Sequence, residues 1–405
     1  MSSENRLQWL LMAATNLYLF FLCSTKWNAG YSISGGILGI LILWLYFVKR
    51  KKAVCASKLF FAVYGIFMGG VLLASYLTGD GPSIHVAYKF ISYSLPMWLL
   101  YLVLQQADSI YSATLKGVVA GSWVLIVESV RELYSSPWGE RLNGSFASAN
   151  NFAMVLEAIL PFLWIQVWEL PKKRKNIFFW ILLFTASMLS LCLILSASRG
   201  GIAGFLLGLI GTGIISYFQN KKWSLKKNLG IFILVGCLAG TGIFGTILRF
   251  QHRSYDSERI LLWKAAYAMW QDHKLYGVGF QRWNTVYRAG YISTAAREPN
   301  LTLAHNNLAN FFSATGIFGG VGYLIFTFGS FALIVLRLHQ NPKDIYMQIM
   351  FWIWIAITIH GFVDNSLYAK FNTRLYFAMW GVSLADIAKA GRKNHKGEKI
   401  YSLCD

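Results

Sequence analysis

Residues 177–218 read IFFWILLFTASMLSLCLILSASRGGIAGFLLGLIGTGIISYF, two long apolar runs whose one charged residue is Arg199. A helix needs about 20 mostly apolar residues to cross a bilayer, and each run has about that length. We therefore predict two membrane-spanning helices joined by the turn Ser198-Arg199-Gly200-Gly201. Because this turn is short, Arg199 is expected at the edge of the membrane.

The rest of the chain repeats this pattern. Of its 405 residues, 56% are hydrophobic and 13% are charged, whereas soluble domains carry about 25% charged residues. This composition excludes an ordinary soluble globule and a disordered chain. The 5 cysteines form no CxxC pair, so neither a disulfide framework nor a zinc site is indicated. No cleavable signal peptide is expected either, because Met1 to Arg6 lead directly into an apolar run.

The predicted fold class is an all-α polytopic membrane protein of about 12 transmembrane helices. The apolar runs lie near residues 8–24, 31–48, 59–77, 86–104, 113–130, 152–170, 177–197, 201–218, 229–248, 316–336, 346–363 and 371–388.

Short basic clusters fall on alternate sides of these spans, at residues 49–52, 172–175, 221–227 and 389–399. The loops on the other side are poor in lysine and arginine. Because positively charged loops stay in the cytoplasm, both termini are expected there. The net charge of +20 is then explained by these loops, and no nucleic-acid partner is expected.

One connection between spans, residues 249–315, is much longer than the others. It carries apolar residues at helical spacing between Ile260 and Trp270, and a loop of this length in a compact protein is usually functional. We expect a large external subdomain of short helices. The predicted domain order is membrane helices 1–9 (1–248), the external subdomain (249–315), membrane helices 10–12 (316–388) and a basic cytoplasmic tail (389–405).

Two arginines on the external side are candidates for a binding site, since charged residues in or beside membrane spans tend to be functional. Arg199 is either an interfacial arginine that reaches toward water or an anion ligand, because a guanidinium holds phosphate oxygens with paired hydrogen bonds. Arg259 opens the amphipathic stretch and could equally pair with Asp256 or Glu258.

His305 is a candidate base, and His85, His252 and His273 are further external candidates that sequence spacing alone does not rank. His305 stands beside two amides, Asn306 and Asn307, just before a span, and an imidazole titrates close enough to neutral pH to accept a hydroxyl proton. For the secondary candidates a structural role, such as buried pairing of Glu157 or Asp364 with an arginine, is at least as good an interpretation. These secondary candidates are Arg141 with the following Asn150 and Asn151, Glu157, Arg282, Arg288, Asn306 and Asp364.

No metal or nucleotide motif is present. The sequence has no HExxH, no acidic DxD pair, no clustered His/Cys set, no P-loop and no dinucleotide fingerprint that follows a predicted strand. We therefore expect neither a metal nor a cofactor. An arginine-rich external pocket at the bilayer edge instead suits a lipid-linked phosphate or diphosphate.

Several segments resemble the O-antigen ligase and polymerase superfamily of bacterial envelope glycosyltransferases. Two departures, Lys274 in place of a frequent proline and Ala314 in place of the glutamate before Thr-Gly, leave the subgroup open. The similar segments are SRGG at 198–201, Arg259 to Lys264 followed by DHKLYGVG at 272–279, AHNN at 304–307 followed by ATGIFGG at 314–320, and RLNGSF at 141–146 with Asn150.

The resemblance implies a multi-pass enzyme of the bacterial inner membrane with its active site facing the periplasm. Its reaction would be an inverting transfer of a glycan from undecaprenyl diphosphate to an acceptor hydroxyl, without metal or ATP. Arg199 and Arg259 would hold the donor diphosphate, and His305 would deprotonate or orient the acceptor. Two fixed guanidiniums would also stabilise the charge that develops on the leaving diphosphate.

The favoured prediction is an O-antigen ligase with lipid A–core oligosaccharide as acceptor, because the external loop and the compact size fit. A polymerase that adds repeat units and a protein O-oligosaccharyltransferase would share the same pocket. A transporter of an anionic lipid or glycan is an alternative of another class, but we find neither a repeat nor a pair of broken helices at the membrane midplane. A structural membrane partner without catalysis is a third class.

Overall fold

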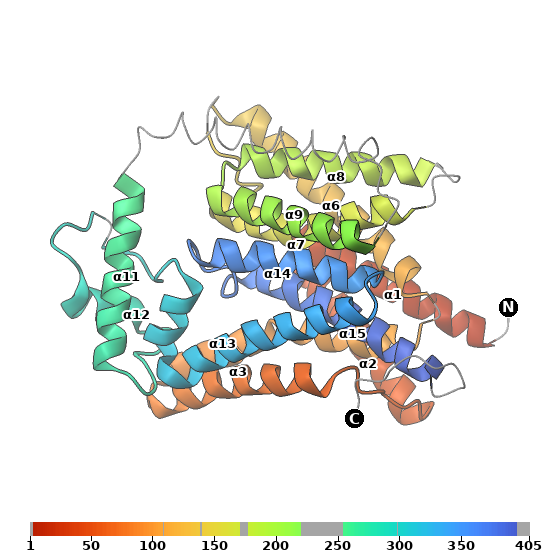
Figure 1. The fold of residues 1–405 in the computed structure, drawn as a ribbon, viewed down its shortest axis with the longest axis horizontal. Coiled ribbons are helices and arrows are strands. Elements are labelled where there is room, and N and C mark those ends of the chain that lie inside the picture. The colour runs from red at the N-terminus through yellow and green to blue at the C-terminus, as the bar shows by residue number, and fades with distance from the viewer. Residues whose placement is uncertain are drawn as a thin grey trace.

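The structure, a computed structural model, describes residues 3–107, 109–137, 140–170, 177–219, 254–297 and 299–394. Within these ranges the regular elements are all helical (Figure 1). They are α1 (Ser3–Ser24), α2 (Asn28–Leu43), η1 (Trp44–Val48), α3 (Lys58–Leu77), α4 (Gly81–Ser92), α5 (Leu95–Leu104), α6 (Ile110–Ser135), α7 (Ala149–Glu169), α8 (Ile177–Leu195), α9 (Arg199–Gln219), α11 (Ser254–Asp272), α12 (Trp283–Val286), η2 (Tyr287–Tyr291), α13 (Asn307–Gln340), α14 (Ile345–Gly361) and α15 (Lys370–Asn394).

Nine segments of the described chain are long and apolar enough to cross a membrane, and α14 is a shorter apolar helix. The prediction of an all-α polytopic membrane protein is confirmed. The predicted spans 346–363 and 371–388 correspond to α14 and α15. The predicted span 229–248 lies outside the described residues. The nine segments are α1, α2 with η1, α3, α4 with α5, α6, α7, α8, α9 and α13.

The long helices run side by side, and α11 lies across one end of this bundle, called the α11 end below (Figure 1). The start of α1 and the end of α15 lie at the opposite end (Figure 1). There Arg392 of α15 donates to the backbone oxygen of Gln105 at 3.1 Å and also to that of Lys52. The basic segment 49–52 and the basic end of α15 therefore share the end away from α11.

Helix α7 forms the centre of the bundle. Its apolar stretch is 89% buried, the largest fraction among the candidate spans of the described chain, and it packs against α8, α9, α14 and α15. Because protein surrounds it, a polar side chain on α7 must find its partner inside the bundle. Glu157 is such a side chain, and it is fully buried.

Helix α13 begins at Asn307, earlier than the predicted start at 316, and its backbone breaks at Gly316, where φ is 58° and ψ is −153°. The break receives the loop after α11: Val278 N donates to Ser313 O at 3.0 Å and Ile317 N donates to Lys274 O at 2.8 Å. A Cβ at Gly316 would lie 2.4 Å from the carbonyl carbon of Leu275, so only glycine fits there. The segments 272–279 and 314–320 thus pack backbone against backbone.

Two other features differ from the sequence-based expectation. The predicted span 86–104 is two helices, α4 and α5, because the chain turns at Tyr93 and Ser94 before Pro96 enters the first turn of α5. The segment predicted as a subdomain of short helices contains one long helix, α11, together with the short α12 and η2.

Candidate functional site

The turn between α8 and α9 presents Arg199 at a helix N-terminus. Ser198 caps α9: its backbone oxygen accepts from Ile202 N at 2.9 Å and its side chain accepts from Gly201 N at 3.4 Å. Arg199 is the first residue of α9 and its side chain is exposed. The dipole and backbone N–H groups of a helix N-terminus attract anions, so a guanidinium at this position strengthens an anion site.

A buried histidine and glutamate lie directly beneath this turn. His360 Nδ1 is 2.9 Å from Glu157 Oε2, and His360 Nε2 is 3.4 Å from Ser198 Oγ. Both side chains of the pair are almost wholly inaccessible to solvent. A Cβ at Gly200 would lie 2.7 Å from the His360 ring, so glycine lets the Arg199 turn rest on the imidazole.

Asn150, at the start of α7, connects this turn to the loop after α14. Its Oδ1 accepts from Arg141 Nη2 at 2.7 Å and from Ser198 Oγ at 3.1 Å, and its Nδ2 donates to Asp364 Oδ2 at 2.8 Å. Arg141 Nε also donates to Ser196 O at 2.9 Å. Arg141 therefore braces the turn and the amide that orients Asp364.

His305 and Asp364 form a second pair, closer to solvent. His305 Nδ1 is 2.9 Å from Asp364 Oδ1, and its side chain is 32% exposed. Burial alone would raise the pKa of Asp364, but the hydrogen bond and charge of His305 and the charge of His360 hold that pKa below its ordinary range. Because an ionised carboxylate only accepts hydrogen bonds, Nδ1 is the donor and Nε2 remains available to a substrate.

The backbone at His305 has a positive φ of 47°, a conformation that a non-glycine residue adopts only when its surroundings hold it there. Those surroundings are the following asparagines. Asn306 caps α13 through Ala309 N at 3.0 Å and donates to Phe362 O at 2.9 Å. Asn307 donates to Ser366 Oγ at 2.8 Å. The amides beside His305 therefore fasten it to the loop that carries Asp364.

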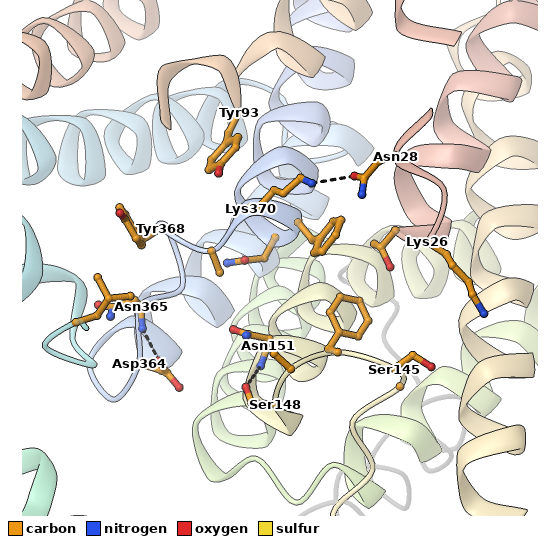
Figure 2. Close-up of a pocket in the computed structure, with 18 of the residues that line it drawn as sticks. Lys26, Asn28, Tyr93, Ser145, Ser148, Asn151, Asp364, Asn365, Tyr368 and Lys370 are labelled. Atoms are coloured by element: carbon orange, nitrogen blue, oxygen red, sulfur yellow. Dashed lines mark hydrogen bonds between the residues drawn. The ribbon is translucent and has the colours of Figure 1, made fainter. Parts of the chain in front are cut away.

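The His305–Asp364 pair opens into a cavity of about 750 Å³. Figure 2 shows Asp364 and Asn365 toward one side of this cavity and Lys370, Asn28 and Lys26 toward the other. The volume is in the range of pockets that hold drug-sized ligands. Its lining mixes lysines, amides, hydroxyls and aromatic rings, which is suitable for a polar glycan.

Arg259 is partly exposed on α11, close enough to His360 for their charges to interact. Its neighbour Glu258 is buried and accepts from the backbone N–H of Arg297 at 3.0 Å. His305 thus contacts Asp364 directly, the turn that carries Arg199 contacts His360 through Ser198 and Gly200, and Arg259 is near enough to His360 for their charges to interact.

The other predicted residues are not all part of this cluster. Arg141 and Asp364 belong to it, and Asn306 supports it as a helix cap. Arg282 and Arg288 are exposed and do not line the cavity. Among the residues that the structure describes, no group of three or more His, Cys, Asp or Glu side chains is arranged to hold a metal ion.

From the sequence, His360 and Ser198 had no assigned function, and pairing with an arginine was one structural interpretation of Glu157 and Asp364. The structure instead pairs each of the two carboxylates with a histidine. A glutamate and a histidine, each alone within an apolar run, were the available signal, since such residues inside a membrane bundle normally pair.

Comparison with known proteins agrees with the motifs. A sequence model of the O-antigen ligase family matches residues 183–324, a segment that contains Arg199, Arg259 and His305. No curated protein is significantly similar to the chain. Family members are glycosyltransferase-like enzymes that act on glycans. The match covers less than half of the chain, and it supports the resemblance to the O-antigen ligase and polymerase superfamily that the motifs indicate.

Proposed function

We propose that this protein transfers a glycan from undecaprenyl diphosphate to an acceptor hydroxyl, as an O-antigen ligase with lipid A–core oligosaccharide as acceptor. The observation that carries the proposal is the His305–Asp364 pair, 2.9 Å between Nδ1 and Oδ1, at the wall of a cavity of about 750 Å³. A histidine whose Nδ1 is bonded to a carboxylate presents Nε2 as a base of fixed tautomer and direction.

In the proposed reaction the acceptor hydroxyl lies in the cavity and gives its proton to His305 Nε2. The acceptor oxygen forms a bond to the anomeric carbon of the donor as the bond from that carbon to the diphosphate oxygen breaks. Attack from the opposite side inverts the configuration at this carbon. Undecaprenyl diphosphate leaves with the bonding electron pair.

The departing diphosphate gains negative charge, and the proposed partners for it are Arg199 and Arg259. Arg199 stands at the N-terminus of α9, where backbone N–H groups add to its charge. Arg259, on α11, is near enough to His360 for their charges to interact. Fixed donors of this kind stabilise a transition state strongly in a site that excludes water, and two of them could take the place of a divalent cation.

The proposed orientation places the α11 end in the periplasm of a bacterial inner membrane. The support is the distribution of charge: the basic segment 49–52 and Arg392 lie at the opposite end, and such residues favour the cytoplasmic side. Both termini would then be cytoplasmic. The prenyl chain would stay in the bilayer while its diphosphate meets the membrane edge at Arg199.

The test is transfer by the purified protein in vesicles that contain one lipid-linked glycan donor and excess chelator. Two rival acceptors are supplied, lipid A–core and a second lipid-linked repeat unit. The proposal predicts elongation of lipid A–core. Elongation of the repeat unit instead would assign the polymerase reaction on the same site.

Variants separate the proposed chemistry from other functions of the fold. Arg199→Ala, Arg259→Ala and His305→Ala should each greatly reduce transfer while expression and membrane insertion stay unchanged. Full activity of all three variants, or an absolute requirement for a divalent metal, would overturn the proposed mechanism. Movement of unmodified glycan lipid across the vesicle without transfer would support a transporter.

A further inference from the structure

Two walls of the cavity carry different chemistry. On one side His305 and Asp364 form the pair described above. On the other lie Lys370, at the start of α15, and Asn28. Lys89 of α4 also lines the cavity and is near enough to Lys370 for their charges to interact. Figure 2 shows Lys370 directed at Asn28, and Lys370 Nζ donates to Asn28 Oδ1 at 2.8 Å.

Positive charge on the second wall exceeds what the neighbouring carboxylates neutralise. Two carboxylates line the cavity, and each is engaged: Glu128 with Lys26, and Asp364 with His305. In the part of the chain that the structure describes, no ion pair joins a carboxylate to Lys89 or Lys370.

Arg374, one turn along α15 from Lys370, adds a third cation behind the wall. Its guanidinium lies 4.3 Å from the centre of the Tyr31 ring and 5.5 Å from that of Tyr93, and Tyr93 lines the cavity. Its Nε is buried and has no hydrogen-bond partner among the described residues. A buried donor of this kind is costly unless a ligand or water satisfies it.

The electrostatic environment of Lys370 is consistent with this arrangement. Burial lowers the pKa of Lys370, and the positive charges of Arg374 and Lys89 lower it further. Bringing three cations together without a carboxylate is unfavourable by itself, and a bound anion would reverse this repulsion.

We propose that Lys89 and Lys370, supported by the charge of Arg374 behind them, form a second anion site, which binds a phosphate or diphosphate group of the acceptor while its hydroxyl meets His305 on the facing wall. This inference rests on the proposed transfer and deepens it, because it assigns the acceptor a chemical class: a phosphorylated glycan lipid. The site is separate from Arg199 and Arg259, neither of which lines the cavity. One protein would then hold the donor diphosphate and the acceptor phosphate at the same time.

The direct test is binding in the absence of turnover. Calorimetry compares a soluble phosphorylated acceptor headgroup with the same glycan after phosphatase treatment, using wild type, Lys89→Gln and Lys370→Gln. Each lysine variant should bind the phosphorylated glycan about tenfold more weakly, the loss expected for one charge-assisted hydrogen bond. Binding of the dephosphorylated glycan should not change. Lys116→Gln, at an exposed position on α6 outside the cavity, is the matched control.

The transfer assay identifies which acceptor carries the phosphate group that the lysines bind. In vesicles of neutral lipid, KM for the acceptor should rise about tenfold in Lys89→Gln and Lys370→Gln, whereas KM for the donor and the rate at saturating acceptor stay near wild type. The assay is run with phosphorylated lipid A–core and with a diphosphate-linked repeat unit. The acceptor whose KM depends on the lysines identifies the source.

Equal binding of phosphorylated and dephosphorylated glycans by wild type, or unchanged binding in both lysine variants, would overturn the second site. A lysine effect that anionic lipid vesicles produce without any acceptor would assign the wall to lipid headgroups instead. The two proposals can be told apart, because calorimetry tests the second anion site without turnover. If wild type transfers no glycan, only the proposed transfer is contradicted, and the binding result for the lysine variants still holds.

Discussion

Two histidine–carboxylate pairs in this molecule have the same geometry and opposite surroundings. In both, Nδ1 lies 2.9 Å from a carboxylate oxygen. The side chains of His305 and Asp364 are 32% and 11% exposed, whereas those of His360 and Glu157 are 1% and 0% exposed. Asn150 connects the pairs, since it bonds both Asp364 and Ser198.

Exposure, not hydrogen-bond geometry, distinguishes the proposed reacting histidine, His305, from the proposed positioning one, His360. His305 can meet a substrate because its pair lines the cavity. His360 cannot, but its ring supports the turn from which Arg199 emerges. One pair is thus expected to act on the acceptor and the other to keep the donor ligand in place.

The largest expected effect is at the exposed pair. His305→Ala should lower kcat about 10²- to 10⁴-fold, the usual contribution of a general base, with little change in KM for the donor. Steady-state transfer kinetics in vesicles measure it. His339→Ala, at an exposed histidine in the last turn of α13, should behave as wild type. An equal fall in kcat in His305→Ala and His339→Ala would contradict a role for His305 as the base.

The next effect concerns the turn that the buried pair supports. Arg199→Ala should lower kcat about 10²- to 10³-fold, as loss of one fixed donor to a developing charge does. Arg199→Lys should also be impaired, because an ammonium cannot form the paired hydrogen bonds of a guanidinium. Arg6→Ala, exposed on α1 at the opposite end, is the control. Wild-type turnover by Arg199→Lys would show that this position needs a positive charge but not the paired hydrogen bonds of a guanidinium.

Asp364→Asn tests whether the carboxylate of the exposed pair orients His305. An amide cannot hold the His305 ring in one tautomer, so kcat should fall about 10²-fold while the cavity stays formed. Transfer rates combined with substrate binding by calorimetry separate the two effects. A variant that binds acceptor poorly but turns over normally would contradict an orienting role for Asp364.

The same variant has a pH signature. Because the folded-state pKa of Asp364 lies below its ordinary value, the ionised carboxylate contributes stability that is complete above about pH 4 and is lost as the pH falls through the folded-state pKa. Asp364→Asn should therefore be destabilised at pH 7 and converge toward wild type in acid. Thermal unfolding in detergent at pH 7, 4 and 3 measures this. A constant difference across that range would show that the carboxylate charge is not responsible.

The smallest effect on catalysis is expected at the buried pair. Glu157→Gln should lower activity per folded molecule less than tenfold but reduce stability by about 1–3 kcal/mol, since a buried charged hydrogen bond is weakened. Thermal unfolding and transfer rates are compared on the same preparation. Glu169→Gln, exposed at the end of the same helix, is the matched control. A loss of kcat as large as that of His305→Ala, with unchanged stability, would make the buried pair catalytic.

The sequence was sufficient for most of the fold because membrane spans are encoded locally, by runs of apolar residues. It was less informative where the chain breaks. The positive φ at Gly316 and the turn at Tyr93 depend on what packs against each segment. The apolar sequence around Gly316 or Tyr93 does not reveal which segment packs against it, so the observed helix boundaries differ from the predicted ones at these two places.

For the candidate site, the motifs identified residues but not partners. Arg199, Arg259 and His305 each stand in a recognisable motif, but the partners that position them, Asp364 for His305 and His360 for the Arg199 turn, lie on another helix and its loop. The His360–Glu157 contact joins positions 203 residues apart, and nothing in either local sequence indicates the other. Asn150, the amide that links the two pairs, could be named as a candidate but not as a connector.

The backbone hydrogen bonds between residues 274–279 and the break in α13 have a mechanical consequence. Hydrogen bonds from Val278, Gly279 and Ile317 fix the loop after α11 to α13. Asn306 and Asn307, at the start of α13, fix His305 to the loop after α14, and Asn150 links that loop to Ser198 in the Arg199 turn. A displacement of α11 would therefore be transmitted along one continuous chain of hydrogen bonds to His305 and then to Arg199, so that the proposed acceptor and donor ligands are mechanically coupled.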